Sequence, residues 1–401
     1  MQVELKKPAI EGGTPTRGEF LIFGSPQIGP EEIEAVVETL KSSWISTGPK
    51  SVAFAKAFRE YVGAPHSIAT NSCTSALHLC LNAAGVGPGD EVITTPMTFA
   101  ATSNVIVHQG AKPVFADIEK EGFLIDPAQI ERKITKKTKA VVPVHYAGMA
   151  CDMDRICAIA KSHKLKLIED AAHAAGTQYK GRKIGNIGDF TCFSFYVTKN
   201  LTTGEGGMVT TADPEAAKMI EKLSLHGLDL DAWQRYSKKG FKHYEIVYPG
   251  YKYNMTDIAA ALGLCQLRKL DEFIRVREEY ARTFEEALGG MDALILPKDN
   301  GVGRHAWHLY PVLVRTEALR IGRDQFIEAL HAENIGVGIH YRAIHLQKYY
   351  RETYGFKPGD FPNAEFVSDR VISLPLYPKM TPRDVEQTIE AVRKLVSYYR
   401  R

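Results

Sequence analysis

The stretch TKAVVPVHYAGMACDMDRICAIAKSHKLKLIEDAAHA, residues 138–174, decides the fold. It opens with an apolar run at 138–148, continues with apolar residues at helical spacing at 152–164, and closes with a second apolar run at 165–174. A strand, a helix and a strand in this order place two parallel strands in one sheet with the helix on its face. The stretch therefore predicts an α/β protein with a mainly parallel sheet flanked by helices.

The same alternation extends over most of the chain and predicts three parts. Residues 1–28 form an N-terminal arm, 29–265 a large α/β domain, and 266–401 a smaller C-terminal α+β domain. The other strands of the large domain are expected at 66–70, 90–96, 112–118, 189–200 and 206–213.

The second half of the chain has a long helical pattern followed by mixed elements. Residues 254–288 predict a helix that breaks near Leu270. Strands are then expected at 305–314 and 337–342, and helices at 322–335 and 381–399.

The bulk composition excludes several classes of protein. The 401 residues include 50 Lys and Arg against 47 Asp and Glu, a net charge of +3, which gives no electrostatic case for a nucleic-acid partner. No apolar run is long enough for a membrane helix, and the N-terminus lacks the apolar core of a signal peptide. No membrane insertion is therefore expected. Six cysteines without a C-x-x-C pair indicate a reducing compartment, so a cytoplasmic location is expected.

Two polar segments lie at strand ends, where sites form in sheets of this kind. Asp170 ends an apolar run and His173 follows it. A carboxylate buried there needs a partner, either a backbone amide or arginine, or a cofactor nitrogen that must stay protonated. TNSCTSALH, residues 70–78, begins a helix whose free N–H groups favour a phosphate, although capping by Asn71 or Ser72 also explains it.

Lys199 lies between an aromatic run and a glycine cluster in FSFYVTKNLTTGEGG, residues 193–207. A lysine at the edge of a desolvated pocket has a lowered pKa and can form a Schiff base with an aldehyde, whereas an ordinary loop lysine stays solvated. The polar loop GYKYNMTD, residues 250–257, is either part of a site or a simple turn. A phosphate cradle, an acid at a strand end and a lysine, in this order, suit pyridoxal 5′-phosphate.

Motifs along nearly the whole chain resemble those of the DegT/DnrJ/EryC1/StrS sugar aminotransferases. They are SSWISTGP, TNSCTSALH, GDEVITTPMTFAAT, PVHYAG, IEDAAHA, FSFYVTKN, TGEGG and MTDIAAALG. The resemblance implies the aspartate-aminotransferase fold (fold type I) and a pyridoxal 5′-phosphate cofactor. It also implies transfer of an amino group from glutamate, which leaves as 2-oxoglutarate, to a nucleotide-linked sugar.

The resemblance implies roles for individual residues. Lys199 forms the Schiff base and moves the proton, Asp170 pairs with the pyridine nitrogen, and His173 lies near the ring and its 3-hydroxyl. The other implied cofactor contacts are the ring-stacking Phe99 and, at the phosphate, Ser72, Cys73, Thr74 and Ser194.

One loop of the family implies a homodimer with shared active sites. The loop that matches residues 250–257 reaches the phosphate of the neighbouring subunit in the family. Many members read G-Y-N-Y-R there, whereas this chain has Lys252 and Asn254, and the choice between these two for that contact stays open.

The motifs PGYKYNMTDI, HAWHLYPVLV and GVGIHYRAIHLQKYYRE resemble most one subgroup of the family. It contains the aminotransferase that makes UDP-4-amino-4-deoxy-L-arabinose for lipid A modification of lipopolysaccharide. This favours a UDP-linked 4-keto-pentose over other nucleotide-linked keto sugars, such as a UDP-4-keto-6-deoxy-hexosamine. The residues expected to bind the substrate are Trp44, His308, His340, Arg342, His345 and Tyr349.

Three alternatives are less favoured. Sugar dehydration on the same cofactor is disfavoured because the dehydratases that resemble this family have a histidine in place of Lys199. A nonenzymatic nucleotide-sugar sensor is disfavoured because the acid, the lysine and the phosphate cradle are all present. A zinc site is disfavoured because a spacing of three along a strand points His305 and His308 to opposite faces, so no metal is expected. The histidines considered for zinc are His305, His308, His340 and His345.

Overall fold

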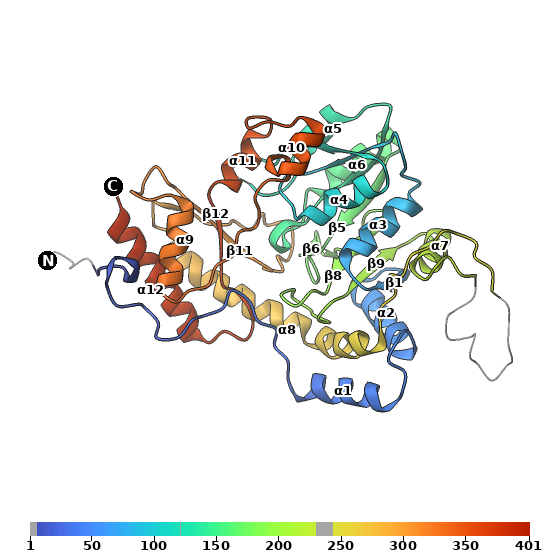
Figure 1. Cartoon of the computed structure of the whole chain (residues 1–401), viewed down its shortest axis with the longest axis horizontal. Helices are drawn as coiled ribbons and strands as arrows, with labels where there is room; N and C mark the ends of the chain where they lie inside the picture. The colour runs from blue at the N-terminus through green and yellow to red at the C-terminus, as the bar shows by residue number, and fades with distance from the viewer. Residues whose placement is uncertain (1–5, 121, 230–243) are drawn as a thin grey trace.

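The computed structural model describes residues 6–120, 122–229 and 244–401. The strands of its main sheet are β1 (His66–Thr70), β2 (Glu91–Thr94), β3 (Lys112–Phe115), β4 (Thr138–Val142), β5 (Lys166–Asp170), β8 (Phe190–Ser194) and β9 (Gly207–Thr211). They lie side by side in the order β1-β9-β8-β5-β4-β2-β3 (Figure 1). Only β9 runs against its neighbours, so the predicted mainly parallel sheet is confirmed.

The stretch at 138–174 folds as its pattern predicts. β4 and β5 pair in parallel, with Ala140 beside Lys166, and α6 (Met153–His163) connects them. The Asp152 side chain accepts a hydrogen bond from the first turn of α6 and so fixes where the helix begins. The apolar residues at helical spacing form its buried face: Met153, Ile156 and Ala160.

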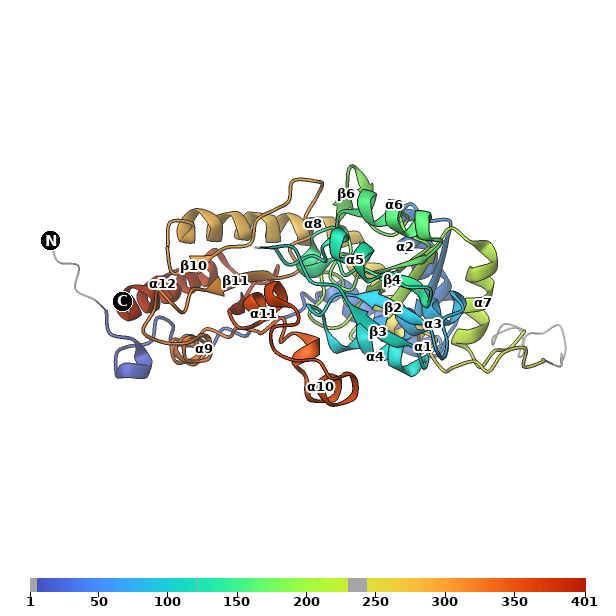
Figure 2. The same cartoon turned by 90° about the horizontal axis from the view of Figure 1, so that it is seen from above.

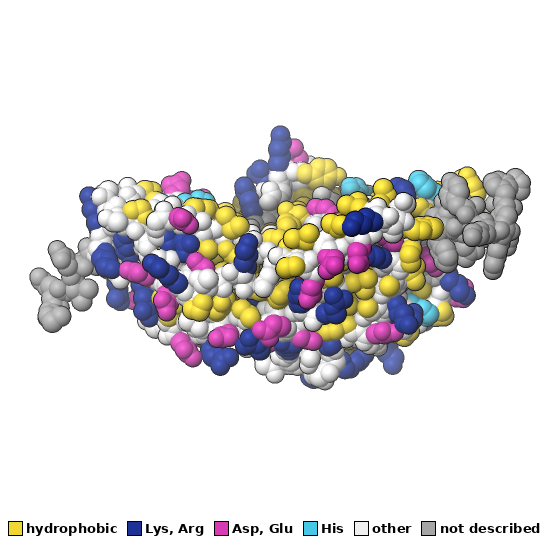
Figure 3. All heavy atoms as spheres, turned by 90° about the horizontal axis from the view of Figure 1, so that it is seen from below, with side chains coloured by type: hydrophobic (Ala, Val, Ile, Leu, Met, Phe, Trp, Pro, Cys, Tyr) yellow, Lys and Arg dark blue, Asp and Glu magenta, His cyan; other side chains and the backbone are white. Residues whose placement is uncertain are grey.

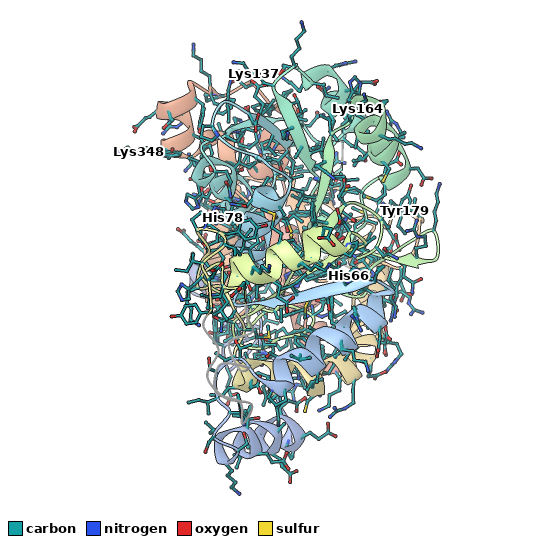
Figure 4. The ribbon with its side chains drawn as sticks, turned by 90° about the vertical axis from the view of Figure 1, so that its right-hand side faces the viewer. His66, His78, Lys137, Lys164, Tyr179 and Lys348 are labelled. Atoms are coloured by element: carbon teal, nitrogen blue, oxygen red, sulfur yellow. The ribbon has the colours of Figure 1, made fainter. Side chains whose placement is uncertain are left out.

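Helices cover both faces of the sheet because its strands are apolar on both sides. On β2, Val92 and Ile93 point into opposite cores. The core around Val92 is closed by α3 (Cys73–Ala83), α4 (Ala100–His108) and α7 (Pro214–Ser224). The core around Ile93 is closed by α2 (Pro49–Val62), α5 (Pro127–Lys133), α6 and the first half of α8 (Asp257–Leu288). At the edge of the sheet, β1 lies between α2 and α7 (Figure 4).

A smaller antiparallel sheet has its own core. Its strands are β10 (Leu294–Ile295), β11 (Tyr310–Val314) and β12 (Val371–Leu374). This sheet packs with α9 (Arg323–Ala332), α12 (Pro382–Tyr399) and the last turns of α8. In both Figures 1 and 2, α8 runs from this smaller unit to the main sheet.

The described part of the N-terminal arm lies against the smaller unit, and its first five residues lie outside the described ranges. η1 (Ala9–Glu11) contacts α9, and Leu21 exchanges backbone hydrogen bonds with the segment after α9. The chain then leaves for α1 (Pro30–Lys41), which packs on α8.

The predicted break near Leu270 is wrong, because α8 is one helix of 32 residues. Leu270 and Ile274 bury in the core of the main sheet, whereas Phe284 and Leu288 bury in the core of the smaller unit. The change in pattern therefore marks a change of packing partner within one helix. The division between residues 265 and 266 falls inside this helix and stays a prediction.

Two predicted strands of the second half are corrected. The strand expected at 305–314 begins only at Tyr310, and the segment expected as a strand at 337–342 has a single isolated bridge, Gly338 to Ser373. Both segments bend toward the main sheet, where their side chains find partners, so they cannot continue a ladder.

The remaining short elements pack mainly against the core of the main sheet. They are β6 (Gln178–Tyr179), β7 (Arg182–Lys183), η2 (Tyr146–Gly148), η4 (Ile344–Leu346), α10 (Lys348–Tyr354) and α11 (Pro362–Ser368). Across the described ranges, no helix combines the length and apolar character needed to cross a bilayer. Basic and acidic side chains are interspersed over the face shown in Figure 3.

Candidate active site

The carboxylate of Asp170 lies at the end of β5, beside the end of β8, and is buried. Its Oδ2 accepts a hydrogen bond from Thr102 Oγ1 at 2.7 Å, and its Oδ1 accepts one from the Ala172 N–H at 3.1 Å. Burial raises the pKa of Asp170, and these hydrogen bonds and the nearby Lys199 oppose that rise. The site thus holds a carboxylate whose oxygens retain lone pairs for a further donor.

The amine of Lys199 reaches the same region from the loop after β8. The backbone N–H of Lys199 donates to Tyr196 O at 2.9 Å, which turns the chain, and Nζ lies 3.4 Å from His308 Nε2. Burial lowers the pKa of Lys199 to about 8, while the nearby Cys73 and Asp170 act in the opposite direction. A lysine with a lowered pKa supplies more neutral amine at physiological pH, which nucleophilic chemistry requires.

The N-terminus of α3 faces this region and suits a phosphate. Ser72 caps the helix, with Oγ accepting from the Ser75 N–H at 3.1 Å, so the predicted capping is present as well. Among the described residues no acceptor takes the N–H groups of Cys73 and Thr74, which are the first two of the helix. Free N–H groups at a helix N-terminus bind an anion.

Backbone packing brings Ser194 to this cradle. Ser194 at the end of β8 pairs with Gly207 at the start of β9. Gly207 lies so close to α3 that a Cβ there would be 2.4 Å from the carbonyl carbon of Ser72. The hydroxyl and the helix N-terminus are therefore held side by side without an intervening side chain.

The residues present fit pyridoxal 5′-phosphate. A buried carboxylate suits a protonated ring nitrogen, a lysine of lowered pKa suits an aldehyde, and the N-terminus of α3 suits a phosphate. Phe99, the residue before α4, leaves 61% of its surface exposed and offers an aromatic face to a ring.

His173 follows Asp170 and is buried between two aromatic neighbours. Its Nδ1 accepts from the Ala147 N–H at 3.2 Å, and its Nε2 lies 3.0 Å from the Tyr341 hydroxyl. Its ring centroid is 4.5 Å from that of His308. Burial, together with Lys199, lowers the pKa of His173 well below its ordinary value, so the ring is neutral and Nε2 carries its proton.

A cavity of about 800 Å³ opens beside the site between α4, the segment at 339–344 and α10. Aromatic side chains form much of its wall, and its cation is Arg342, which makes no ion pair with any described residue. The wall residues that bear on the substrate are Phe99, His108, Tyr341, Arg342, Tyr349 and Tyr350.

Of the predicted substrate residues, Arg342 and Tyr349 line this cavity. His308 instead contacts Lys199, and His340 is half-buried with Nδ1 2.9 Å from Ser373 Oγ and its ring against Phe23. These two histidines border the lysine rather than the open cavity.

His345 and Trp44 are not brought to the cavity of this chain. His345 is fully buried with Nε2 2.9 Å from Glu365, because the apolar surroundings of η4 leave no access to solvent. Trp44 is exposed beside Gly48, where α2 begins.

Lys252 and Asn254 lie on the surface beside the turn before α3. Lys252 Nζ donates to Asn254 Oδ1 at 2.7 Å, and Asn254 Nδ2 donates to Thr47 Oγ1 at 2.5 Å. The backbone of Tyr253 accepts from the Asn71 N–H at 2.8 Å. These backbone and side-chain contacts fix the loop next to the cradle.

The four histidines considered for zinc have separate partners. His305 stacks on Trp307 and accepts from its N–H at 2.8 Å, while the other three contact Lys199, Ser373 and Glu365. Within the part of the chain that the structure describes, no group of three His, Cys, Asp or Glu side chains is placed to hold a metal ion.

The sequence missed three residues of the site. Thr102 donates to Asp170, Tyr341 bonds to His173, and Asn200 bonds to His308. Asn200 follows Lys199 directly and Tyr341 lies between two predicted residues, so adjacency was the available signal. Thr102 lies in the quoted motif GDEVITTPMTFAAT, but nothing in that motif shows that the packing of α4 brings its hydroxyl to Asp170.

Comparisons with known proteins show the family of the chain. The model of the DegT/DnrJ/EryC1/StrS aminotransferase family matches residues 26–393. The spore coat polysaccharide biosynthesis protein SpsC of Bacillus subtilis is 52% identical over 381 residues, which cover 95% of this chain and 98% of SpsC.

Solved structures of sugar aminotransferases have the same fold. The putative sugar aminotransferase Spr1654 of Streptococcus pneumoniae, in its PMP form, superposes with a TM-score of 0.89 at 35% identity, over 94% of this chain and 99% of that one. PseC of Helicobacter pylori, an aminotransferase involved in pseudoaminic acid biosynthesis, gives a TM-score of 0.88 at 30% identity, over 95% and 100%.

Proposed function

The chain belongs to the DegT/DnrJ/EryC1/StrS aminotransferase family, and from this premise we propose that it transfers the amino group of glutamate to a nucleotide-linked 4-keto sugar. It is a pyridoxal 5′-phosphate-dependent sugar aminotransferase of fold type I. The observation that carries the proposal is the amine of Lys199, which lies 3.4 Å from His308 Nε2 and has its pKa lowered to about 8 by burial. The cavity that presents Arg342 opens beside this site, because Tyr341 lines the cavity and bonds to His173.

Each residue around the lysine has a distinct task. When bound, the cofactor supplies the electron sink that amino-group transfer needs. Asp170, oriented by Thr102, would face the ring nitrogen, and the N-terminus of α3 with Ser194 would hold the phosphate. Lys199 Nζ would take the proton from the α-carbon of glutamate and deliver it to the cofactor, and in the second half of the reaction it would move a proton from the cofactor to C4 of the sugar.

The cavity supports a nucleotide-linked substrate. Arg342 is a cation without an ion pair in the described structure, and a guanidinium suits the oxygens of a diphosphate. Phe99, Tyr341 and Tyr349 provide aromatic surface for rings. Among the lining residues there is no carboxylate, so nothing there repels an anionic substrate.

Two sugars are candidates. The motifs around residues 250, 305 and 340 favour a UDP-4-keto-pentose, the precursor of the amino-arabinose of lipid A. The names of SpsC and PseC favour instead a sugar of a surface polysaccharide or glycan, such as a UDP-4-keto-6-deoxy-hexosamine. Apolar wall residues, Val107, Ile339 and Ile344, suit the methyl group of a 6-deoxy sugar.

We infer a homodimer with shared sites, which would account for Trp44, Lys252 and Asn254 lying outside this chain's own cavity. Trp44, Lys252 and Asn254 lie at the surface near Thr47, and α1 exposes an apolar stripe. That stripe has helical spacing and consists of Ile33, Val37 and Leu40. Exposed apolar residues in such a row are typical of an interface.

One assay tests the proposed reaction. The protein, pyridoxal 5′-phosphate and glutamate are mixed with UDP-4-keto-pentose or, separately, with UDP-4-keto-6-deoxy-hexosamine, and products are identified by mass spectrometry. Lys199→Ala is the matched control. Amination of one sugar, with 2-oxoglutarate formed in equal amount, supports the proposal and selects the sugar. No 2-oxoglutarate from glutamate alone would overturn the aminotransferase assignment and favour a sensor. If 2-oxoglutarate forms from glutamate but neither sugar is aminated, both substrate candidates are overturned.

A further inference from the structure

The amine of Lys199 lies within hydrogen-bonding distance of one ring nitrogen of His308, and the other ring nitrogen of His308 faces Asn200. Lys199 Nζ lies 3.4 Å from His308 Nε2, and His308 Nδ1 lies 3.2 Å from Asn200 Oδ1. The amide nitrogen of Asn200 donates to Ala306 O at 2.6 Å, so its oxygen is the atom that faces the ring. An amide oxygen only accepts, and therefore Nδ1 of His308 carries the ring proton.

It follows that His308 Nε2 presents a lone pair to Lys199. Burial lowers the pKa of His308 well below its ordinary value, and Lys199, His173, Arg277 and His340 act in the same direction. The ring is therefore neutral, with its single proton committed to Asn200. In this state His308 can accept a hydrogen bond from the lysine amine and cannot donate one.

The backbone of His308 is fixed from two sides. Its N–H donates to Ala147 O at 2.9 Å, and its carbonyl accepts from Arg277 Nη1 at 3.2 Å. Arg277 is a buried side chain of α8 that also donates to Trp307 O at 3.3 Å. The acceptor thus stands on a rigid support that is separate from the loop carrying Lys199.

We propose that His308, oriented by Asn200, is the positioning residue that holds the amine of Lys199 whenever the cofactor does not hold it. The inference rests on the proposed function, in which the amine is released and recaptured in each cycle. A free lysine side chain has several rotatable bonds, and confining it near the substrate has an entropic cost. One hydrogen bond to Nε2 confines the amine and leaves its nitrogen lone pair available for the substrate proton.

The arrangement has a measurable consequence, because an acceptor stabilises the protonated amine. The titratable groups around Lys199 are Cys73 on α3, Asp170 on β5 and the rings of His173, His308 and His340. Cys73 and Asp170 raise the pKa of Lys199 and stay in place when His308 is substituted. Because burial also lowers the pKa of Lys199, the loss of the acceptor is read from the difference between two His308 variants that both keep the site filled.

The experiment uses the full chain loaded with pyridoxamine 5′-phosphate, which has no carbonyl to occupy Lys199. Trace acetylation with acetic anhydride over a pH series, read by mass spectrometry of the Lys199 peptide, gives the pKa of the amine. Exposed Lys136 in the same digest is the internal reference.

Three variants separate positioning from structure. His308→Phe removes the acceptor and is expected to lower the pKa of Lys199 by about one unit. His308→Gln places an amide oxygen near the position of Nε2 and is expected to keep the pKa close to that of the parent. Asn200→Asp brings a carboxylate beside the His308 ring and is expected to raise the pKa of Lys199. The glutamate half-reaction should lose about tenfold in rate in His308→Phe with little change in KM.

An unchanged pKa in a folded His308→Phe protein, or equal shifts for Phe and Gln, would overturn the proposal. If the Phe variant does not fold, His308→Asn, too short to reach the lysine, replaces it and is expected to lower the pKa as well. No sugar enters these measurements, so their failure is distinct from failure of the substrate assignment.

Discussion

Thr102 gives the proton of its hydroxyl to Oδ2 of Asp170 over 2.7 Å. Thr98 Oγ1 lies 2.7 Å from the Thr102 oxygen and, since Thr102 has no second proton, Thr98 is the donor of that pair. Burial raises the pKa of Asp170, and this relay from α4 opposes the rise. The charge on the carboxylate that would face the cofactor therefore depends on Thr102, a residue to which the recognised motifs assigned no role.

Thr102→Val keeps the shape of the side chain and removes the hydrogen bond. The pKa of Asp170 should rise further, and a neutral acid holds a ring nitrogen protonated less well. Because this hydrogen bond is made to a charged group, its loss in Thr102→Val should lower kcat/KM for glutamate by about tenfold to hundredfold. Stopped-flow measurement of the half-reaction checks this, with Thr102→Ser, which keeps the hydroxyl, as the control. Equal losses in both variants would show that packing rather than the hydrogen bond matters.

Lys199 makes the stability of the cofactor-free protein depend on pH. Its pKa is lowered from 10.5 to about 8, so between these values the unfolded chain binds more protons than the folded one, and stability rises with pH. The free-energy cost of burying the charged amine is complete below pH 8 and absent above pH 10.5. Lys199→Met should therefore stabilise the cofactor-free protein at neutral pH by on the order of 2 kcal/mol, and by much less in alkaline solution. Urea unfolding at both pH values tests this, and an equal gain at both would contradict it.

Gly207 fixes the distance between β9 and the phosphate cradle. A methyl group there would lie 2.4 Å from the Ser72 carbonyl carbon and 2.7 Å from the Cys73 nitrogen, both backbone atoms. Gly207→Ala should displace the start of α3 and weaken cofactor binding by tenfold or more, about 1.4 kcal/mol. Equilibrium dialysis of the cofactor measures the effect. Gly87→Ala, where a Cβ meets open space, is the matched control and should bind as the parent does.

Much of the main sheet could be predicted because its signals are local. In the stretch at 138–174, apolar runs bounded by a helix with an Asp152 cap give the strands and the crossover without any tertiary information. The break expected near Leu270 failed for a tertiary reason. Leu270 and Phe284 belong to different cores, and a sequence pattern does not tell which neighbour a helix face meets.

The residues of the site also fall into two groups, those that local sequence motifs indicate and those that only tertiary packing brings together. Asp170, Lys199 and the turn at Ser72 lie in short motifs at strand ends, and the structure brings them together. The bond from Tyr341 to His173 joins residues 168 positions apart, so no local pattern could reveal it. His345 is predicted to bind the substrate, but the structure buries it against Glu365. The sequence gives no sign of this partner.

Glu333 anchors the N-terminal arm to the smaller unit. Its fully buried carboxylate accepts from the N–H of Ala9 at 2.8 Å, from the N–H and hydroxyl of Thr16 at 2.7 Å each, and from Lys394 Nζ at 2.8 Å. These partners hold the pKa of Glu333 below its ordinary value despite burial, so the anchor is present at neutral pH and is lost as pH falls through that lowered pKa.

Glu333→Ala removes the anchor and leaves Lys394 buried without its partner. Breaking a buried pair of this kind costs about 3–5 kcal/mol. The arm should then detach locally, and trypsin should cleave after Arg17 at least tenfold faster than in the parent, as followed by mass spectrometry of the released peptide. Glu390→Ala, which removes an exposed pair with Lys6, is the control and should leave the cleavage rate unchanged. Equal cleavage rates in Glu333→Ala and the parent would show that the arm is held mainly by its apolar contacts, such as that of Leu21.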